Sequence, residues 1–255
     1  MLLAAAPVAP GGAAAIVGGQ EAAPRAYPYA AALVDVERRR EFCGGALIGP
    51  RHVLTAAHCL TGSYADTGRV AVLLGDHDLR TAAESRYARV ARPARFSVHP
   101  GYDRATQHDD LAVITLSAPV RPDAGVRPVP LPARGESFVH TRLEAVGWGA
   151  TSFGGNPSPV LRTVSLDTLS NAACALRGVD GLTPAQLCTW TPGRDTCVYD
   201  SGGPLVHRDA AGRPVLAALV SYGRGCATDS PAVNTRVTAH LDWIARTTGL
   251  RPPSP

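Results

Sequence analysis

Short apolar runs separated by turn-forming residues cover most of the chain after Ile16. A parallel α/β sheet would need a crossover helix after most strands, and no such helical periods lie between the runs. Strands at this density predict an all-β fold built from barrels or a sandwich. The eight runs with strand character are residues 30–36, 45–48, 53–57, 70–74, 111–116, 143–146, 215–220 and 233–237.

A proline-rich stretch divides the chain into two halves. Residues 121–132 contain four prolines, which cannot donate ladder hydrogen bonds and favour an extended connector. We therefore predict a domain boundary there, with one unit at residues 16–125 and a second at residues 126–250. Residues 251–255 are expected to form a loose tail.

One helix is expected near the end of the chain. Leu241, Ile244 and Ala245 share a helical face, Thr238 can cap the start, and Gly249 can end it.

Composition excludes several classes of function. The chain has 255 residues, 45% of them hydrophobic, and a formal net charge of +4 carried by scattered arginines. A dense basic stripe is missing, so nucleic-acid binding is not expected. After residue 15, no stretch reaches 18 uncharged apolar residues, so we expect no membrane span.

The first fifteen residues look like part of a secretory signal. They are small, apolar and uncharged, but the positive n-region is missing and the apolar run is short, as in a truncated signal. Three alanines, residues 13–15, satisfy the small-residue cleavage pattern directly before Ile16. We therefore expect a secreted, extracellular protein.

Cysteine spacing agrees with an oxidising compartment. The spacings do not match a zinc site, and an even number of widely spaced cysteines favours three disulfides over buried cytosolic thiols. The six are Cys43, Cys59, Cys174, Cys188, Cys197 and Cys226.

Three polar residues in separate motifs are candidates for chemistry. Ser201 stands between an aspartate and two glycines, whose backbone freedom presents its hydroxyl on a bend. His58 ends an apolar run beside Cys59, and Asp110 opens another apolar run, where a buried carboxylate would need a hydrogen-bonded partner. Their order, His then Asp then Ser, distinguishes the chymotrypsin arrangement from the subtilisin and α/β-hydrolase orders.

Over residues 16–250 the sequence resembles the trypsin/chymotrypsin family of serine proteases. The resemblance rests on six motifs in register: Ile16-Val17-Gly18-Gly19, Thr55-Ala56-Ala57-His58-Cys59, Asp110-Leu111-Ala112-Val113, Gly147-Trp148-Gly149, Asp200-Ser201-Gly202-Gly203-Pro204 and Ser221-Tyr222-Gly223.

This resemblance implies two antiparallel six-stranded β-barrels with a C-terminal α-helix. The first barrel would carry His58 and Asp110, and the second would carry Ser201. The implied disulfides are Cys43–Cys59, Cys174–Cys188 and Cys197–Cys226.

The resemblance also assigns roles. Ser201 would be the nucleophile, His58 the general base and then acid, and Asp110 the group that orients the imidazole. Ser221 would hold Asp110, and the segment containing Ser221 and Tyr222 would pair with the substrate backbone.

One residue departs from the family pattern at the oxyanion hole. The backbone N–H groups of Ser201 and Tyr199 would form this hole, and the family usually has glycine where Tyr199 stands. A tyrosine there could crowd the leaving-group side. The alternative to an active enzyme is therefore an impaired homologue that acts as a binding module.

The chain start implies a route of activation. In the family, a new amine at the Ile16 position inserts beside the aspartate at the Asp200 position and orders the pocket. Here Ala15 stands where an Arg or Lys is usual, so we expect removal of the leader to free Ile16 directly.

The specificity pocket is predicted to be acidic. Asp195 lies where the family places the pocket floor, which favours Arg or Lys before the scissile bond. Two differences, Ala232 for a usual glycine and Asn234 for a usual tyrosine, leave a bulky apolar preference as the alternative. The predicted pocket residues are Asp195, Thr196, Gly223, Gly225 and Ala232.

No cofactor is expected, and the alternative is a structural calcium ion near Asp76, His77, Asp78 and Glu84. Expected partners are protein or peptide substrates and proteinaceous protease inhibitors. The protein itself is expected to be a monomer. Arg38, Arg39 and Arg40 should form an exposed hairpin tip. A competing hypothesis is an α/β-hydrolase that uses Ser201, Asp229 and His240.

Overall fold

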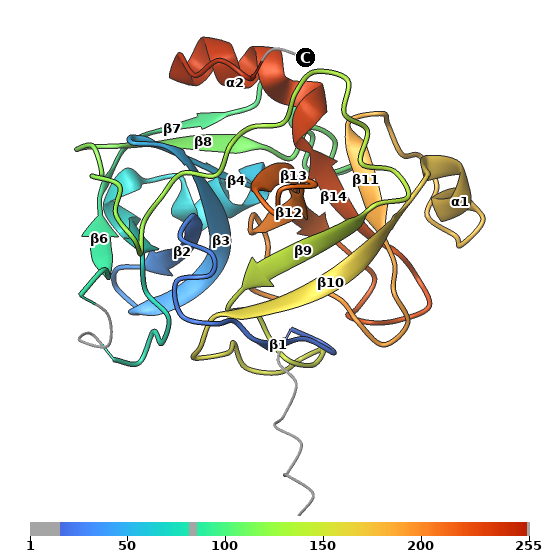
Figure 1. Cartoon of the computed structure of the whole chain (residues 1–255), viewed down its shortest axis with the longest axis horizontal. Helices are drawn as coiled ribbons and strands as arrows, with labels where there is room; N and C mark the ends of the chain where they lie inside the picture. Colours follow the sequence, from blue (N-terminus) through green and yellow to red (C-terminus); the bar gives the residue numbers. More distant parts are fainter. Residues whose placement is uncertain (1–15, 82–85, 254–255) are drawn as a thin grey trace, which may run out of the picture.

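Two antiparallel sheets, each curled into a barrel, make up the molecule (Figure 1). This computed structural model describes residues 16–81 and 86–253. The predicted signal segment (1–15), Glu84 and the end of the predicted tail lie outside the described residues.

The first barrel has the strand order β6-β5-β2-β3-β4-β8-β7. Only Arg92 separates β6 from β7, so these two act as halves of one bent strand that closes a six-stranded ring. In β5 every second residue is buried, which is the alternation expected of a strand with one face toward the core. The strands are β2 (Ala30–Asp35), β3 (Arg40–Gly49), β4 (His52–Thr55), β5 (Val70–Leu74), β6 (Arg89–Ala91), β7 (Pro93–Val98) and β8 (Ala112–Leu116).

The second barrel closes through hydrogen bonds. Its order is β10-β11-β14-β13-β12-β9, with β9 pairing back to β10 and the short β1 added outside β10. Two antiparallel six-stranded barrels are therefore confirmed. The strands are β1 (Gln20–Glu21), β9 (Arg142–Gly147), β10 (Arg162–Leu169), β11 (Gln186–Thr189), β12 (Pro204–Arg208), β13 (Pro214–Tyr222) and β14 (Ala232–Arg236).

The C-terminal helix is confirmed, but its predicted start is wrong. A 3-10 turn, η4 (Val237–His240), contains Thr238, and the α-helix α2 (Leu241–Thr248) begins only after it. Gly249 ends the helix in the left-handed conformation, with φ +74°, as a C-terminal glycine does. The other helices are short: η1 (Ala57–Leu60), η2 (Gly62–Tyr64), η3 (Thr67–Arg69) and α1 (Asn171–Ala175).

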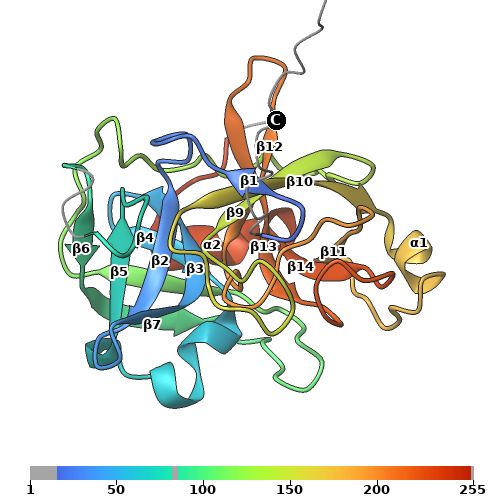
Figure 2. The ribbon, with the colours of Figure 1, turned by 90° about the horizontal axis from the view of Figure 1, so that it is seen from below.

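The two ends of the chain cross over between the barrels. The segment at β1 pairs with β10 of the second barrel, whereas α2 lies over β7 and β8 of the first (Figure 1). Seen from below, β1 lies across β10 while α2 lies behind the sheets (Figure 2). This exchange ties the barrels together and fixes the cleft between them.

All three predicted disulfides are present, and no cysteine is free. Two of them, Cys43–Cys59 and Cys197–Cys226, border the cavity that contains Ser201.

Candidate active site

The position of His58 is fixed by its neighbours on both sides. It lies in η1 directly after β4, and the adjacent Cys59 is bonded to Cys43 in β3. Its backbone N–H donates to Asp110 Oδ1 at 2.9 Å, so the histidine is tied to the aspartate by main chain as well as side chain.

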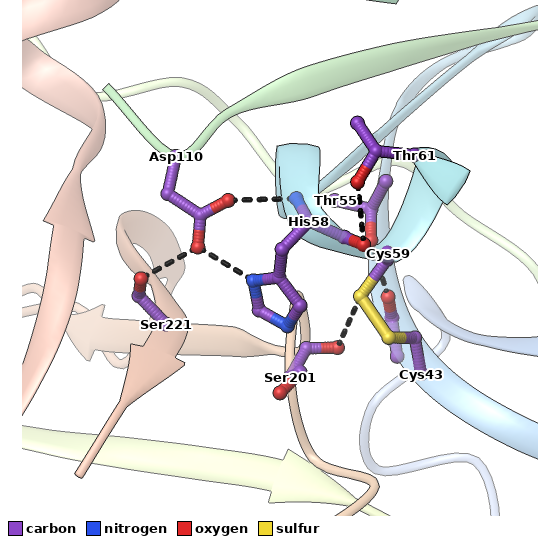
Figure 3. Close-up of a disulfide and its surroundings, with 9 residues drawn as sticks. Cys43, Thr55, His58, Cys59, Thr61, Asp110, Ser201 and Ser221 are labelled. Carbon is purple, nitrogen blue, oxygen red and sulfur yellow. Dashed lines mark hydrogen bonds and ion pairs between the residues drawn. A yellow bond between two sulfur atoms is a disulfide. The ribbon is translucent and has the colours of Figure 1, made fainter. Parts of the chain in front are cut away.

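The Asp110 carboxylate is fully buried at the junction of the barrels and accepts from several donors (Figure 3). His58 Nδ1 lies 2.7 Å from Oδ2, and the Ser221 hydroxyl donates to the same oxygen at 2.6 Å. Because a carboxylate only accepts, Nδ1 of His58 carries a proton and Nε2 of the neutral ring is left to take one.

Ser201 lies on the other side of the imidazole, and both residues line one cavity (Figure 3). Gly44 N–H donates to the Ser201 carbonyl at 2.8 Å, which anchors the turn to the first barrel. The next residue, Gly202, has φ +77°, and a Cβ there would come within 2.2 Å of Thr55 Oγ1. The glycine after the serine is therefore required by close approach of the two barrels.

The cavity beside Ser201 has a volume of about 440 Å³ and contains a buried acid. Asp195 is only 6% exposed, and its Oδ2 accepts from Ala227 N–H at 3.0 Å. Burial raises the pKa of Asp195 to about 6. The structure brings all the predicted pocket residues to this cavity: Asp195, Thr196, Gly223, Gly225 and Ala232.

Asn234 does not line this cavity. Its side-chain amide donates to Leu187 O and Thr189 Oγ1 of β11, at 3.1 and 3.0 Å. The side chain is thus used to join β14 to β11, which a tyrosine at this place would not do.

His58 also lines a second, larger groove of about 810 Å³. Ser221, Tyr222 and Gly223 at the end of β13 form one wall of it. An edge of this kind can pair with an extended peptide.

Comparison with known proteins agrees with this geometry. The Trypsin family model matches residues 16–244. The chain belongs to the trypsin family. Brachyurin of Leptuca pugilator is 39% identical over 242 residues, covering 93% of this chain and 100% of that protein. Tryptase of Mus musculus is 36% identical, covering 90% and 87%, and trypsin-1 of Astacus astacus is 32% identical, covering 90% and 98%. The chain is thus a trypsin-like serine protease.

In this trypsin-family chain, the aspartate before the serine is buried without a cation. Asp200 accepts from the N–H groups of Cys197 and Gly149, both at 2.9 Å, and burial raises its pKa to about 7. Within the described ranges no salt bridge reaches it. A Cβ on Gly147 or Gly149 would lie 2.2–2.3 Å from this carboxyl, which explains both glycines of the Gly147-Trp148-Gly149 motif.

The Ile16 segment packs beside the acidic pocket. Ile16 is fully buried, and Val17 O accepts from Asp195 N–H at 3.0 Å. Gly18 also lies against residues 193–194, where a Cβ would meet the Gly193 carbonyl at 2.3 Å.

Tyr199 adopts a conformation that side chains usually avoid. Its φ is +79°, in the left-handed region that costs a residue other than glycine about 1–2 kcal/mol. The Arg40 guanidinium carbon lies 5.8 Å from the Tyr199 ring centroid. This departure from the family pattern is therefore built into the loop beside Ser201.

Two contacts or environments of acidic residues were not predicted from the sequence. Glu41 in β3 is 4% exposed with both carboxylate oxygens unpaired, and burial, with the charge of Asp200 next in weight, raises its pKa well above the ordinary value. Asp109 Oδ1 lies 2.9 Å from Nε2 of the buried His240. In the sequence Glu41 ends a run of five charged residues, 37–41, so its local pattern gave no sign of burial.

The residues weighed for calcium do not converge on one point. Asp78 is engaged by its neighbour Arg80, with Nε 2.9 Å from Oδ1, and Asp76 Oδ1 accepts from His77 N–H. In residues 16–81 and 86–253 the one group of three possible metal ligands is Cys43, His58 and Cys59, whose sulfurs form a disulfide. Glu84 lies outside the described residues, and the expectation that the chain has no cofactor stays a prediction.

The α/β-hydrolase alternative is wrong. The sheets are antiparallel, His240 is bonded to Asp109, and Asp229 is an exposed loop residue. In the described part of the chain, no helix is long and apolar enough to cross a membrane.

Proposed function

We propose that the chain is a catalytically competent endopeptidase that cleaves after Arg or Lys. The observation that carries the proposal is Asp195, a buried carboxylate with no cationic partner among the described residues, in the cavity that opens beside Ser201 and His58. A guanidinium or ammonium group entering this cavity would supply the missing charge. A small apolar side chain would leave the carboxylate unpaired, which is costly.

Ser201, His58 and Asp110 would carry the chemistry. The Ser201 oxygen attacks the scissile carbonyl carbon while His58 Nε2 takes the hydroxyl proton. The C–N bond then breaks as His58 returns the proton to the leaving amine, which leaves an acyl-enzyme. Water attacks this ester with His58 again as base, and Ser201 is regenerated. Asp110, held by Ser221, stabilises the imidazolium in both steps.

The oxyanion would be held by the backbone N–H groups of Ser201 and Tyr199. Tyrosine retains the main-chain donor, so the substitution changes the surroundings of the hole and not its chemistry. The competing function, a binding module, draws only on this residue.

Activation would follow from freeing the amine of Ile16. Asp200 is buried and has no cationic partner in the described ranges while Ile16 N is part of a peptide bond. An ammonium group at Ile16 would neutralise the Asp200 carboxylate. We propose that removal of the segment ending at Ala15 does this, so that the secreted chain has no stable zymogen. N-terminal sequencing of secreted protein that starts upstream of Ile16 would reject this route.

Secretion and partners follow from the same features. Three disulfides fit an oxidising compartment. Extended protein or peptide segments, including those of proteinaceous inhibitors, would bind along the groove at Ser221 to Gly223. The protein would bind them as a monomer.

Labelling by a serine-directed fluorophosphonate tests competence. The chain starting at Ile16 should be labelled at Ser201, and Ser201→Ala and His58→Ala variants should not. A folded wild-type protein that resists the reagent would favour the binding-module alternative.

A further inference from the structure

A basic residue, Arg40, contacts Tyr199, which is one of the residues that line the cavity beside Ser201. Both the Cys197–Cys226 and the Cys43–Cys59 disulfides line the cavity together with Ser201. If the acyl side of a substrate lies along Ser221 to Gly223, the leaving-group peptide must pass over Cys43–Cys59 and the start of β3.

Aromatic rings form the floor of this leaving-group side. Phe42 and Tyr64 stack with centroids 3.8 Å apart and planes 7° from parallel, and both line the cavity. Tyr199 lines the same cavity, together with Phe153, which is 72% exposed. A peptide chain crossing here meets ring faces and no carboxylate among the lining residues at this end.

Arg40 lies beside this floor. Arg40 opens β3 and is exposed, Glu41 after it is buried, and Phe42 is the extra residue of a bulge opposite β2. The Arg40 guanidinium rests over the Tyr199 ring, 5.8 Å from its centroid. Tyr199 lies two residues before Ser201 in the chain, so the Arg40 cation contacts the loop that carries the nucleophile.

The charge of Arg40 is not matched within the protein. Arg38 and Arg69 both lie within 4.0 Å of the buried Asp35 carboxylate, at 3.9 and 3.2 Å. Across the described ranges, Arg40 forms no salt bridge and is exposed. A guanidinium that lies over a ring face and forms no salt bridge among the described residues is suited to bind a carboxylate.

We propose that Arg40, held over Tyr199, is a specificity-determining residue that selects an acidic side chain among the first three residues after the scissile bond. The proposal rests on the proposed function and narrows its substrates to peptides with a basic residue before the bond and an acidic residue after it. It also assigns a role to Tyr199 in place of the family's usual glycine, because glycine has no ring that Arg40 could contact.

Paired peptides test the proposal. Each pair has Arg before the scissile bond and differs only by Glu against Gln at one of the first three following positions. The readout is the ratio of kcat/KM for Glu over Gln within one enzyme, so differences in overall activity between variants cancel. We expect a ratio of about three to five at one of the positions, falling as salt is raised.

Charge reversal sharpens the test. Arg40→Glu should invert the ratio and create a preference for Lys over Gln at the same position, and Tyr199→Gly should reduce the ratio. The matched control is Arg38→Ala, on the same hairpin but tied to Asp35, which should leave the ratio unchanged. A Glu-over-Gln ratio of one in the wild-type enzyme, or a ratio above one that persists in the Arg40→Glu variant, overturns the inference.

Binding to an inactive background separates this from the proposed function. Affinities of the same peptides for Ser201→Ala protein should show the same Glu preference, inverted by adding Arg40→Glu. If wild type cleaves the peptides without any preference, the inference fails and the proposed function stands. If wild type cleaves none but the preference appears in binding, the proposed function fails, and Arg40 is left as a residue that selects acidic side chains in binding alone.

Discussion

Single residues at the active cleft hold charge that the fold leaves unmatched. Asp195 and Asp200 are both buried, and desolvation raises both pKa values, to about 6 and about 7. Each carboxylate would be neutralised by a cation, which is a substrate side chain for Asp195 and the amine of Ile16 for Asp200. Specificity and activation thus share one physical cause.

Binding of small cations should therefore depend on pH through Asp195. Above pH 6 the carboxylate is ionised and attracts an amidine or guanidine ligand, and below it protonation removes that attraction. We expect affinity to fall as pH drops through about 6, measured by calorimetry with a benzamidine-type ligand. A His58→Ala background should keep this dependence, and Asp195→Asn should abolish it together with most of the binding.

Replacing Tyr199 should relieve strain. With φ +79°, Tyr199→Gly removes a left-handed penalty of about 1–2 kcal/mol, so the midpoint of thermal unfolding should rise. Opening the leaving-group side should also raise kcat on peptide substrates. Unchanged stability and unchanged kinetics would show that the tyrosine neither strains the loop nor crowds the cleft.

At the scale of elements, the predicted runs coincide with part or all of β2, β3, β4, β5, β8, β9, β13 and β14, whereas β6, β7, β10, β11 and β12 were not predicted. The runs at 70–74 and 111–116 match β5 and β8 to within one residue. The run at 53–57 was too long, because Ala57 already begins the 3-10 turn η1 that carries His58. β10 was missed because Ser165 and Asp167 interrupt its apolar residues, which are only Val164, Leu166 and Leu169.

The candidate site was predictable only where local motifs carried it. Short motifs around His58, Asp110 and Ser201 are visible in the sequence. The unpaired Glu41, the Arg40–Tyr199 stacking and the Asp109–His240 pair each join residues far apart or depend on burial. Only the packing of the two barrels reveals them. The same limit explains Asn234, whose contacts belong to β11.

The turn that delivers Asp110 depends on a contact between the two halves. Asp109 has φ +48°, and its carboxylate lies 2.9 Å from Nε2 of His240, which is 3% exposed. Asp109→Ala would leave that buried nitrogen unpaired. We expect a loss of about 1–3 kcal/mol in the free energy of unfolding, measured with denaturant, and a lower kcat. Arg134→Ala, which breaks an exposed pair with Asp242, is the control and should change stability little.

At the scale of the whole molecule, cleavage before Ile16 should change how stability depends on pH. While Ile16 is internal, the pKa of Asp200 is about 7 against 3.8 for the free side chain. A raised carboxyl pKa means that its contribution to stability is present below about pH 4 and is lost as pH rises through 7.

A precursor that retains residues before Ile16 should therefore lose thermal stability between about pH 4 and pH 7. The chain that starts at Ile16 should instead be stabilised at neutral pH, because the ammonium group pairs with the ionised carboxylate. Asp200→Asn should remove the difference between the two forms, as seen by calorimetric melting in parallel. Identical pH profiles for precursor and processed chain would contradict the activation proposal.

The account as a whole requires that one cleft combine nucleophile, base and acidic pocket. Turnover of short peptides with Arg, Lys, Phe or Leu before the scissile bond tests this most directly, on the chain starting at Ile16. The account predicts cleavage after Arg and Lys, rates at Phe and Leu lower by about 10²-fold or more, and loss of about 10⁴-fold or more in kcat for Ser201→Ala. Cleavage after Phe or Leu in preference to Arg and Lys, or activity that survives Ser201→Ala, would contradict it.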